Sequence, residues 1–532
     1  MNKKYIIIQP LLLSIILAAG MLIGYGIQDT SDFELIKVHE NEEKLRPTHI
    51  DNVMRLIESN YLFEPDYDEM TNKALNSISQ SLDPFSAYIE PSEFYHVRDN
   101  LNASYTGMGI YSQDFKDSLV IIEILKNSPA QKAGLKTLEK ILKINGKNLV
   151  GWNNEQITQE FLKNKGKKLD LLISGRDFKK RIVSLKIDSV ETQTVNRIFN
   201  FGNSTLYVGL SQFSNHTYRE LLGIIEKNAE NKKIKNLIID VRDNPGGYLQ
   251  EVVKILDQLF SQSGLTLVET VYKDGRKDVL KTSGRNFYDI EKVTVIINEF
   301  SASGSEVLAG SLQDHDRALI IGKNSFGKGL VQDQYDLFNG GALRLTVANY
   351  FLPSGRSIQK DIKFPKTIKK DQFYTGQDTF FSLIKRRPLY SGRGIEPDII
   401  VNDSLFSKSL SLVENTSYKL YPVLIDYIFR NKVIMNSGKN DLKNDYNFLN
   451  DKVVSAFLEQ YQLPDNKILT EIVKSKIAYL INGRALETEI ILKSDPFVQR
   501  ALFSEINPKK DNKLSSKLSS KKNKAGKTEG IK

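Results

Sequence analysis

Cysteine is absent from this chain of 532 residues, and histidine is scarce. The lack of cysteine excludes disulfide bonds, thiol catalysis, iron–sulfur clusters, cysteine-rich zinc sites and a lipidated N-terminal cysteine. No two histidines stand at the spacing of about three to five residues that a helix-borne or finger-type metal site requires. The five are His39, His49, His96, His216 and His315. We therefore do not expect a structural or catalytic metal.

Positive charge is in excess, but it is concentrated at the C-terminus. The net charge is +10, and residues 508–532 contribute +7, because nine lysines face only Asp511 and Glu529. The rest of the chain carries 10 − 7 = +3, so the charge does not indicate nucleic acid as a partner. A lysine- and serine-rich segment without aromatics cannot bury enough apolar surface to fold. We predict a disordered tail that is either solvated or in contact with an anionic lipid or polymer.

One long apolar run, residues 5–27, follows Lys3 and Lys4. As a helix it would span about 34 Å, which is enough to cross roughly 30 Å of hydrocarbon. Acidic residues follow the run, so the positive-inside rule places the N-terminus in the cytoplasm and the remainder outside. We expect an extracytoplasmic protein on the periplasmic side, either anchored to the inner membrane by this segment or released after signal cleavage.

The residue pattern changes several times along the chain and predicts an α/β multidomain protein. Apolar residues first recur at helical spacing, then in short β-rich runs, then in alternating strand-like and helix-like stretches, and finally again at helical spacing. We place the segments at 1–30 (anchor or signal), 31–103 (helical), 104–190 (β-rich module), 191–402 (α/β core), 403–507 (helical) and 508–532 (tail).

The segment FSASGSE at 300–306 lies where a buried strand is predicted to end and a helix to begin. A hydroxyl there lies near the unpaired N–H groups of the helix start, which can bind an oxyanion. The alternative is a capping box, because Ser303 and Glu306 have its S-x-x-E spacing. A nucleophile also needs a base, and His315 would lie about 18 Å along the helix, out of reach. We therefore do not expect a Ser-His-Asp triad.

Lys328 lies between two glycines beside Phe326, at the start of an apolar strand. An apolar site would lower the pKa of its amine and make it a base, whereas the alternative is a surface lysine in a turn. Gln332 falls on the same side of the strand and could orient the amine. The stretch 322–329 nearly matches a phosphate-binding loop, but Gly329 replaces the required Ser/Thr and a strand follows. Nucleotide binding is therefore not expected.

A third element is IDVRDNPGG at 239–247, a strand that runs directly into a turn. Its adjacent glycines, Gly246 and Gly247, would let a backbone N–H approach a reacting carbonyl closely, as one arm of an oxyanion hole. Taken alone, the segment is better interpreted as an ordinary strand-to-helix turn.

In this order, the segments resemble the C-terminal processing (tail-specific) peptidases, which are serine endopeptidases with an embedded PDZ domain. The resemblance covers residues from about 75 to 402. Its blocks are LDPFSAYI (82–89), DVRDNPGG (240–247), SASGSEVLAG (301–310), FGKGLVQ (326–332), LRLTVANYFLPSGRSIQ (343–359) and GIEPDI (394–399). It implies a crotonase/ClpP-like α/β catalytic core together with a PDZ domain.

The resemblance also implies roles for individual residues. Ser303 would be the nucleophile, Lys328 the base and Gln332 the partner that orients the base. The oxyanion hole would use the N–H of Gly304, where the family often has alanine, together with that of Gly246 or Gly247. No cofactor is implied.

Residues 104–190 resemble the PDZ domain of the family, with YTGMGI as the carboxylate-binding loop. The backbone of Gly107, Met108 and Gly109 would receive a peptide C-terminus, and the strand from Ile110 would pair with the peptide. The expected partners are protein or peptide substrates with free C-termini, and homo-oligomerisation is left open. The alternative function is a catalytically silent PDZ scaffold that holds C-terminal tails.

Overall fold

The computed structural model describes residues 49–150, 152, 154–229, 234–360, 379–402, 404–430, 454–455, 458–459, 464 and 466–506. The predicted N-terminal anchor and the lysine-rich tail lie outside these residues. The chain divides into two compact units, 1–73 and 74–532. In the first, α2 (His49–Asn60) has the helical pattern expected from the sequence, and α3 (Tyr67–Gln80) crosses the division. None of the helices described here is long and apolar enough to cross a membrane.

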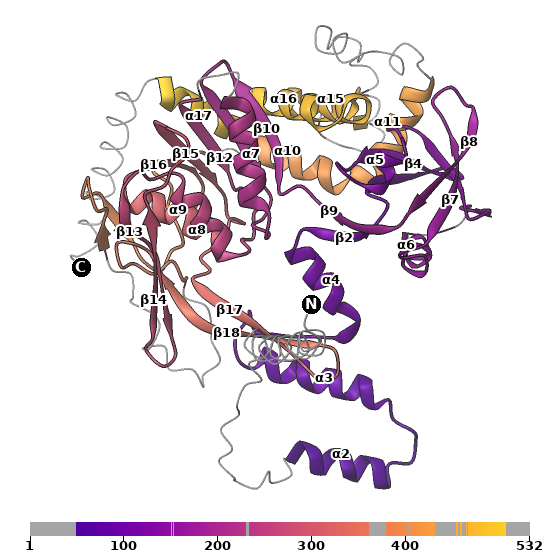
Figure 1. Cartoon of the computed structure of the whole chain (residues 1–532), viewed down its shortest axis with the longest axis horizontal. Coiled ribbons are helices and arrows are strands. Elements are labelled where there is room, and N and C mark those ends of the chain that lie inside the picture. The colour runs from indigo at the N-terminus through magenta and orange to yellow at the C-terminus, as the bar shows by residue number, and fades with distance from the viewer. Residues whose placement is uncertain are drawn as a thin grey trace, which may run out of the picture. The chain divides into compact units, whose positions relative to one another are not determined.

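A six-stranded sheet of the order β10-β11-β12-β15-β16-β21 lies at the centre of the second unit (Figure 1). From β11 onward neighbouring strands are parallel, while β10 is antiparallel to β11. Parallel strands that are buried on both faces have nearly continuous apolar sequences, which is why the strands of this sheet can be predicted from apolar runs in the sequence. The strands are β10 (Val195–Phe201), β11 (Thr205–Leu210), β12 (Asn236–Asp240), β15 (Lys292–Ile297), β16 (Ala318–Gly322) and β21 (Ile399–Ile400).

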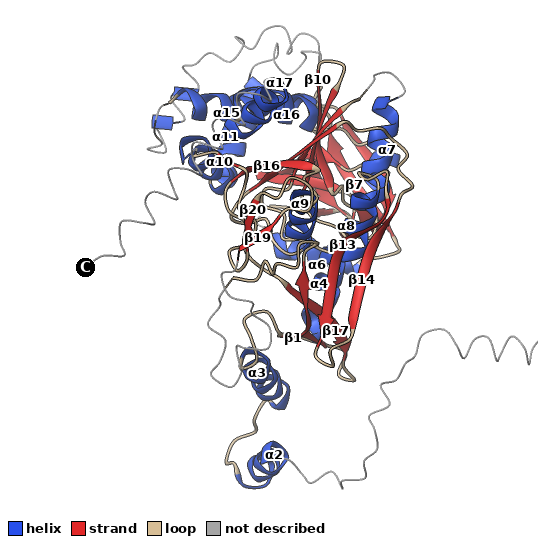
Figure 2. Ribbon diagram, turned by 90° about the vertical axis from the view of Figure 1, so that its left-hand side faces the viewer, coloured by secondary structure: helices blue, strands red, loops and turns tan. Residues whose placement is uncertain are grey.

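Helices cover both faces of this sheet (Figure 2). Successive side chains of a strand point to opposite faces. On one face Val208, Ile239 and Val295 pack against α7, α8 and α9, and on the other Ile238 and Ile296 pack against α17. These helices are α7 (Thr217–Ala229), α8 (Leu249–Asp257), α9 (Gly304–Asp314) and α17 (Pro496–Ile506). The α/β alternation predicted for the core is confirmed.

A second sheet has the order β1-β18-β13-β14, with β17 also paired to β18. Its strands are β1 (Ala87–Ile89), β13 (Ser263–Tyr272), β14 (Lys277–Ser283), β17 (Leu330–Asp336) and β18 (Ala342–Phe351). Strand β1 lies inside the segment that the sequence pattern predicted to be only helical. It is extended because it pairs with β18, more than 250 residues away, and local periodicity carries no information about such a partner.

The β-rich module forms a five-strand path, β3-β4-β5-β7-β8, with β6 beside β5 and a separate β2–β9 pair. Strand β2 ends at Gly107 and β3 begins at Ile110, so Met108 and Gly109 separate the two strands. Leu138, where glycine is common in the resembling family, adopts a φ of 63° and is fully buried. The elements are β2 (Ser104–Gly107), β3 (Ile110–Phe115), β4 (Ser118–Ile124), α5 (Pro129–Lys132), β5 (Lys140–Ile144), β6 (Lys147–Asn148), α6 (Asn154–Lys163), β7 (Lys168–Ser174), β8 (Lys180–Lys186) and β9 (Asp188–Glu191).

The described part of the C-terminal region is helical, as predicted, and contacts both the β-rich module and the α/β core. Phe115 and Val120 of the module share an apolar cluster with α10, α11 and α15. At the start of α16, Arg484 binds Glu123 of β4 with two hydrogen bonds. The helices are α10 (Ser404–Asn415), α11 (Ser417–Arg430), α15 (Lys467–Asn482) and α16 (Arg484–Ser494). The remaining elements are α4 (Pro91–Leu101), β19 (Thr379–Phe381) and β20 (Pro388–Tyr390).

A buried ion pair joins the end of α9 to the loop after β18. Arg356 and Asp314, which are 1% and 0% exposed, lie 2.8 Å apart. The guanidinium also donates to Gln313 Oε1, and Asp314 accepts from the N–H of Ser354. Arg356 Nη1 also donates to the carbonyl of Tyr390 at 3.4 Å. Protein groups alone therefore satisfy both buried charges, as burial away from solvent requires.

Replacing Arg356 with Met should leave a buried carboxylate without its cation, at a cost of about 3–5 kcal/mol in the free energy of unfolding. Urea unfolding followed by circular dichroism measures this. The double variant Arg356→Met/Asp314→Leu should recover at least half of the loss, while the exposed-site control Lys493→Met should match the wild type. A single variant as stable as the wild type would contradict this account of the pair.

Candidate functional site

Ser303 lies at the junction between the loop after β15 and the first turn of α9. Every residue from 301 to 315 is buried except Ser303, which is partly exposed. Its backbone has φ 53° and ψ −112°, a conformation that non-glycine residues rarely adopt and that is typical of strained functional positions. The neighbouring hydroxyls of Ser301 and Ser305 donate to the carbonyls of Val241 and Asn244. The junction thus presents one serine to solvent and uses the other two to hold the backbone.

The glycine turn predicted as the second oxyanion arm packs directly against this junction. A Cβ placed on Gly246 would lie 2.9 Å from the nitrogen of Gly304, and one on Gly247 would lie 2.1 Å from the carbonyl oxygen of Phe213. The φ angles of 103° and 139° also require glycine at these two positions. Only glycine therefore fits at these two positions, where the backbone of the turn packs closely against its neighbours, as the sequence suggested.

The two glycines differ in what their amides do. The N–H of Gly246 donates to Asn244 Oδ1 at 2.9 Å. Among the hydrogen bonds of the described residues, none uses the N–H of Gly247 or Gly304. Of the two alternatives left open by the sequence, the geometry favours Gly247 as the partner of Gly304.

Lys328 lies on the loop that precedes β17. Its Nζ donates to Gln332 Oε1 at 2.6 Å and lies 4.9 Å from the ring centre of Phe85, and Gln332 Nε2 donates to the carbonyl of Phe85 at 2.6 Å. Burial, aided by the nearby cation of Arg344, lowers the pKa of Lys328, although Asp83 and Glu306 act in the opposite direction. A lysine with a lowered pKa is suited to act as a base.

The predicted contact between the side chains of Ser303 and Lys328 is not formed in this structure. No hydrogen bond among the residues described joins Ser303 Oγ to Lys328 Nζ, which donates to Gln332 Oε1 instead. The two backbones nevertheless meet at one atom, because Glu306 Oε2 accepts from the N–H of Ser303 at 2.9 Å and from that of Lys328 at 2.8 Å. The structure thus brings the two residues together through a third.

Glu306 is the residue whose role the sequence reading missed. It is fully buried, and besides the two amides above it accepts from Gly327 N at 2.7 Å and from the Ser325 hydroxyl. Burial raises the pKa of Glu306, and the four hydrogen bonds oppose this without reversing it. The only signal in the sequence was the capping-box spacing, which predicts the bond to Ser303 but not those to the lysine loop.

The DPF turn at 83–85 supports the base from the other side. Asp83 accepts from the amides of Phe85 and Ser86 at 2.8 and 2.9 Å and from the Ser86 hydroxyl at 2.7 Å. The Thr346 hydroxyl of β18 also donates to Asp83. These bonds hold the carbonyl and ring of Phe85 against Gln332 and Lys328.

The predicted peptide-binding loop lies between β2 and β3. Met108 is 2% exposed within the apolar core of the module, and Gly109 has a φ of 80° and lies against Ser128. Ile110 opens β3, an edge strand of the sheet. The Tyr105 ring lies over Gly107, its hydroxyl donates to the carbonyl of Ile110 at 3.5 Å, and burial raises the pKa of Tyr105 to about 12.

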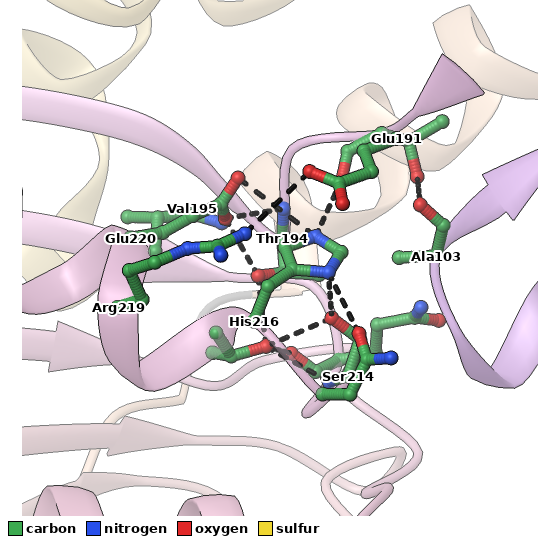
Figure 3. Close-up of polar contacts among 12 residues, drawn as sticks. Ala103, Glu191, Thr194, Val195, Ser214, His216, Arg219 and Glu220 are labelled. Carbon is green, nitrogen blue, oxygen red and sulfur yellow. Dashed lines mark hydrogen bonds and ion pairs between the residues drawn. The ribbon is translucent and has the colours of Figure 1, made fainter. Parts of the chain in front are cut away.

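The linker between the β-rich module and the core is held by His216 and Glu220 (Figure 3). His216 Nε2 contacts the carbonyl of Thr192 at 3.1 Å, and Glu220 Oε2 accepts from the amides of Thr194 and Val195. His216 therefore serves the linker, as His315 serves the carbonyl of Thr266. In the described part of the chain, no group of three His, Asp or Glu side chains could hold a metal ion.

The variant Glu306→Gln should loosen both halves of the site at once. A glutamine offers one acceptor oxygen in place of two, so at least one buried N–H would lose its partner, at about 1–3 kcal/mol. We expect a lower thermal midpoint and at least about a tenfold slower reaction of Ser303 with a fluorophosphonate probe. The exposed-site control Glu299→Gln should react at the wild-type rate. Equal rates for both variants would contradict the positioning role.

Comparison with known proteins gives two family matches, peptidase family S41 over residues 204–371 and a PDZ domain over residues 97–174. The carboxy-terminal-processing protease of Bartonella bacilliformis is 32% identical over 317 residues, which are 58% of this chain and 71% of that protein. The carboxy-terminal processing protease CtpA of Bacillus subtilis is 30% identical over 306 residues, which are 57% of this chain and 65% of that protein.

Among solved structures, a photosystem II D1 C-terminal processing protease is 23% identical, with 66% of this chain and 87% of that chain covered and a TM-score of 0.35. The sequence matches carry the assignment, since they include both the α/β core and the β-rich module. The predicted resemblance is confirmed: the chain belongs to the S41 peptidases, the serine-type carboxy-terminal processing proteases, and contains a PDZ domain.

Proposed function

We propose that this protein is an endopeptidase that cleaves exported proteins by acyl transfer, with Ser303 as nucleophile and Lys328 as base. One observation carries the proposal: the sole accessible serine of a buried junction packs against the glycine turn at Gly246 and shares a carboxylate with a lysine whose pKa is lowered. We also propose that the catalytic core is a crotonase/ClpP-like α/β spiral, which the parallel strand order β11-β12-β15-β16 supports.

The chemistry follows from these groups. The neutral amine of Lys328 takes the proton of Ser303, and the oxygen attacks a peptide carbonyl while the amides of Gly247 and Gly304 bind the oxyanion. The C–N bond then breaks, and the Lys328 ammonium returns its proton to the leaving amine. Water, deprotonated by the same amine, hydrolyses the acyl-enzyme. The first step requires Nζ to rotate from Gln332 toward Ser303. The neutral amine has two N–H donors and one lone pair, so it can keep one hydrogen bond to Gln332 while the lone pair accepts the proton of Ser303.

The substrate would enter through its C-terminus. The edge strand β3 and the loop at 107–110 support binding of a free carboxylate with strand addition, which is the general mode of PDZ domains. The charge pattern around residues 5–27 supports an extracytoplasmic location, with the substrates among exported proteins.

The variant Ser303→Ala should abolish cleavage of an unstructured protein with a free C-terminus, because the other two serines of the junction, Ser301 and Ser305, are buried. Lys328→Ala should lower kcat by about 10²- to 10⁴-fold. Gel-based degradation assays and fluorophosphonate labelling measure both effects, with the exposed Ser261→Ala as matched control. A wild type that neither cleaves nor labels at residue 303 would instead identify a silent PDZ scaffold.

The pH dependence of kcat/KM should reflect the ionisation of Lys328. Only the neutral amine accepts a proton, so kcat/KM should rise with pH and level off above an inflection that lies below 10.5, the ordinary lysine pKa. Arg344→Gln removes a cation that disfavours the ammonium, so the pKa of Lys328 rises and the inflection moves to higher pH. Arg276→Gln, on an exposed hairpin, should leave the profile unchanged. An inflection that moves downward in Arg344→Gln would contradict the assignment of Lys328 as base.

A further inference from the structure

The glycine turn of the site is anchored at its N-terminal end by Arg242. This arginine follows β12 and is 12% exposed. Its guanidinium donates from Nε to both oxygens of Asp240 at 3.0 Å, and from Nη2 to Asp240 Oδ2 at 2.6 Å. Asp240 also accepts from the Tyr207 hydroxyl at 2.7 Å. The pKa of Asp240 is lowered, because the charge and hydrogen bonds of Arg242 outweigh the effect of burial.

The other face of this guanidinium is held by the C-terminal region. Asp495, 2% exposed, accepts from Arg242 Nη2 at 2.6 Å and from Nη1 at 3.4 Å. The guanidinium also lies 4.8 Å from the ring centre of Phe497. Arg242 and Asp495 are 253 residues apart in the chain, so the bidentate contact is purely tertiary.

Asp495 is itself immobilised between two helices. It follows α16, and its Oδ1 accepts from the amides of Phe497 and Val498 in the first turn of α17. α17 in turn packs on the central sheet through Phe497, Val498 and Ala501. The carboxylate is thus a fixed point relative to β12, and a guanidinium bound to it cannot move without breaking buried hydrogen bonds.

The turn that follows Arg242 carries the amide proposed for the oxyanion hole. Asp243 has a φ of 58° and exchanges hydrogen bonds of 2.9 and 2.7 Å with the Asn298 side chain. Asn244 accepts from Ala302 N through its carbonyl and from Gly246 N through its side chain. Residues 243–246 join Arg242 to Gly247, and the hydrogen bonds of Asp243 and Asn244 constrain this backbone, so a displacement of Arg242 would shift Gly247 as well.

We infer that Asp495 is a positioning residue for the reaction: through Arg242 it holds the turn that presents the Gly247 amide to the oxyanion. The inference rests on the proposed function for its kinetic part only. The C-terminal helical region contributes no reacting group, but through Asp495 it would fix the geometry of the oxyanion hole.

The variant Asp495→Asn tests the inference. Asparagine keeps the size and the helix-capping oxygen, but its amide group replaces one of the two carboxylate oxygens that bind Arg242. On the full-length protein we expect kcat to fall about tenfold, KM to stay within about twofold and the thermal midpoint to stay within a few degrees. Lys493→Gln, on the exposed face of α16, is the matched control and should equal the wild type.

Amide hydrogen exchange of residues 241–248 gives a second readout that needs no activity. Exchange there should be about tenfold faster in Asp495→Asn than in Lys493→Gln, and unchanged elsewhere in the core. Unaltered exchange, or a loss of activity accompanied by general unfolding, would overturn the inference. If the wild type shows no Ser303-dependent cleavage, the proposed function fails, and the exchange measurement still decides whether Asp495 holds the turn.

Discussion

The buried carboxylate of Glu306 is the interaction on which the site depends. A carboxylate accepts hydrogen bonds only, and here three backbone amides and one hydroxyl supply its donors in the absence of water. Those donors belong to the serine junction and to the lysine loop, which are separate in the chain and lie on different elements. Any arrangement that moved one segment away from the other would leave buried donors unpaired, so the geometry of nucleophile and base is fixed by backbone contacts and not by a direct bond between them.

The same carboxylate works against the chemistry electrostatically, and the surrounding groups must compensate for it. A negative charge near Lys328 favours the ammonium, as does Asp83, whereas burial and the cation of Arg344 favour the neutral amine and prevail. The ring and carbonyl of Phe85, held by the DPF turn, supply an apolar wall and a fixed position for Gln332. The N-terminal segment therefore contributes to the environment of the base although it contains no reacting group.

The two faces of the central sheet serve different purposes. On the α7–α9 face, the helix after β15 carries Ser303 and the turn after β12 leads into α8, so the carboxyl ends of adjacent parallel strands bring the site together. On the opposite face, α17 and Asp495 hold the first residue of that turn. The helix α16 ends at Ser494, directly before Asp495, and begins at Arg484, which binds Glu123 of the PDZ domain. The C-terminal helices thus contact both functional parts of the chain.

Much of this protein was determined by local sequence. Apolar runs, glycine turns and ordered motifs are each a property of a few consecutive residues. They predict the buried strands of the core, the helices α7, α8 and α9, the serine at a strand-to-helix junction and the family. The tertiary structure decided what depends on distant partners. β1 is a strand only because β18 lies beside it, and Glu306 and Asp495 acquire their roles from groups that chain folding brings to them. Periodicity and spacing describe one segment of the chain at a time. The hydrogen-bond partners of a buried polar group depend instead on which segments pack around it in the folded protein.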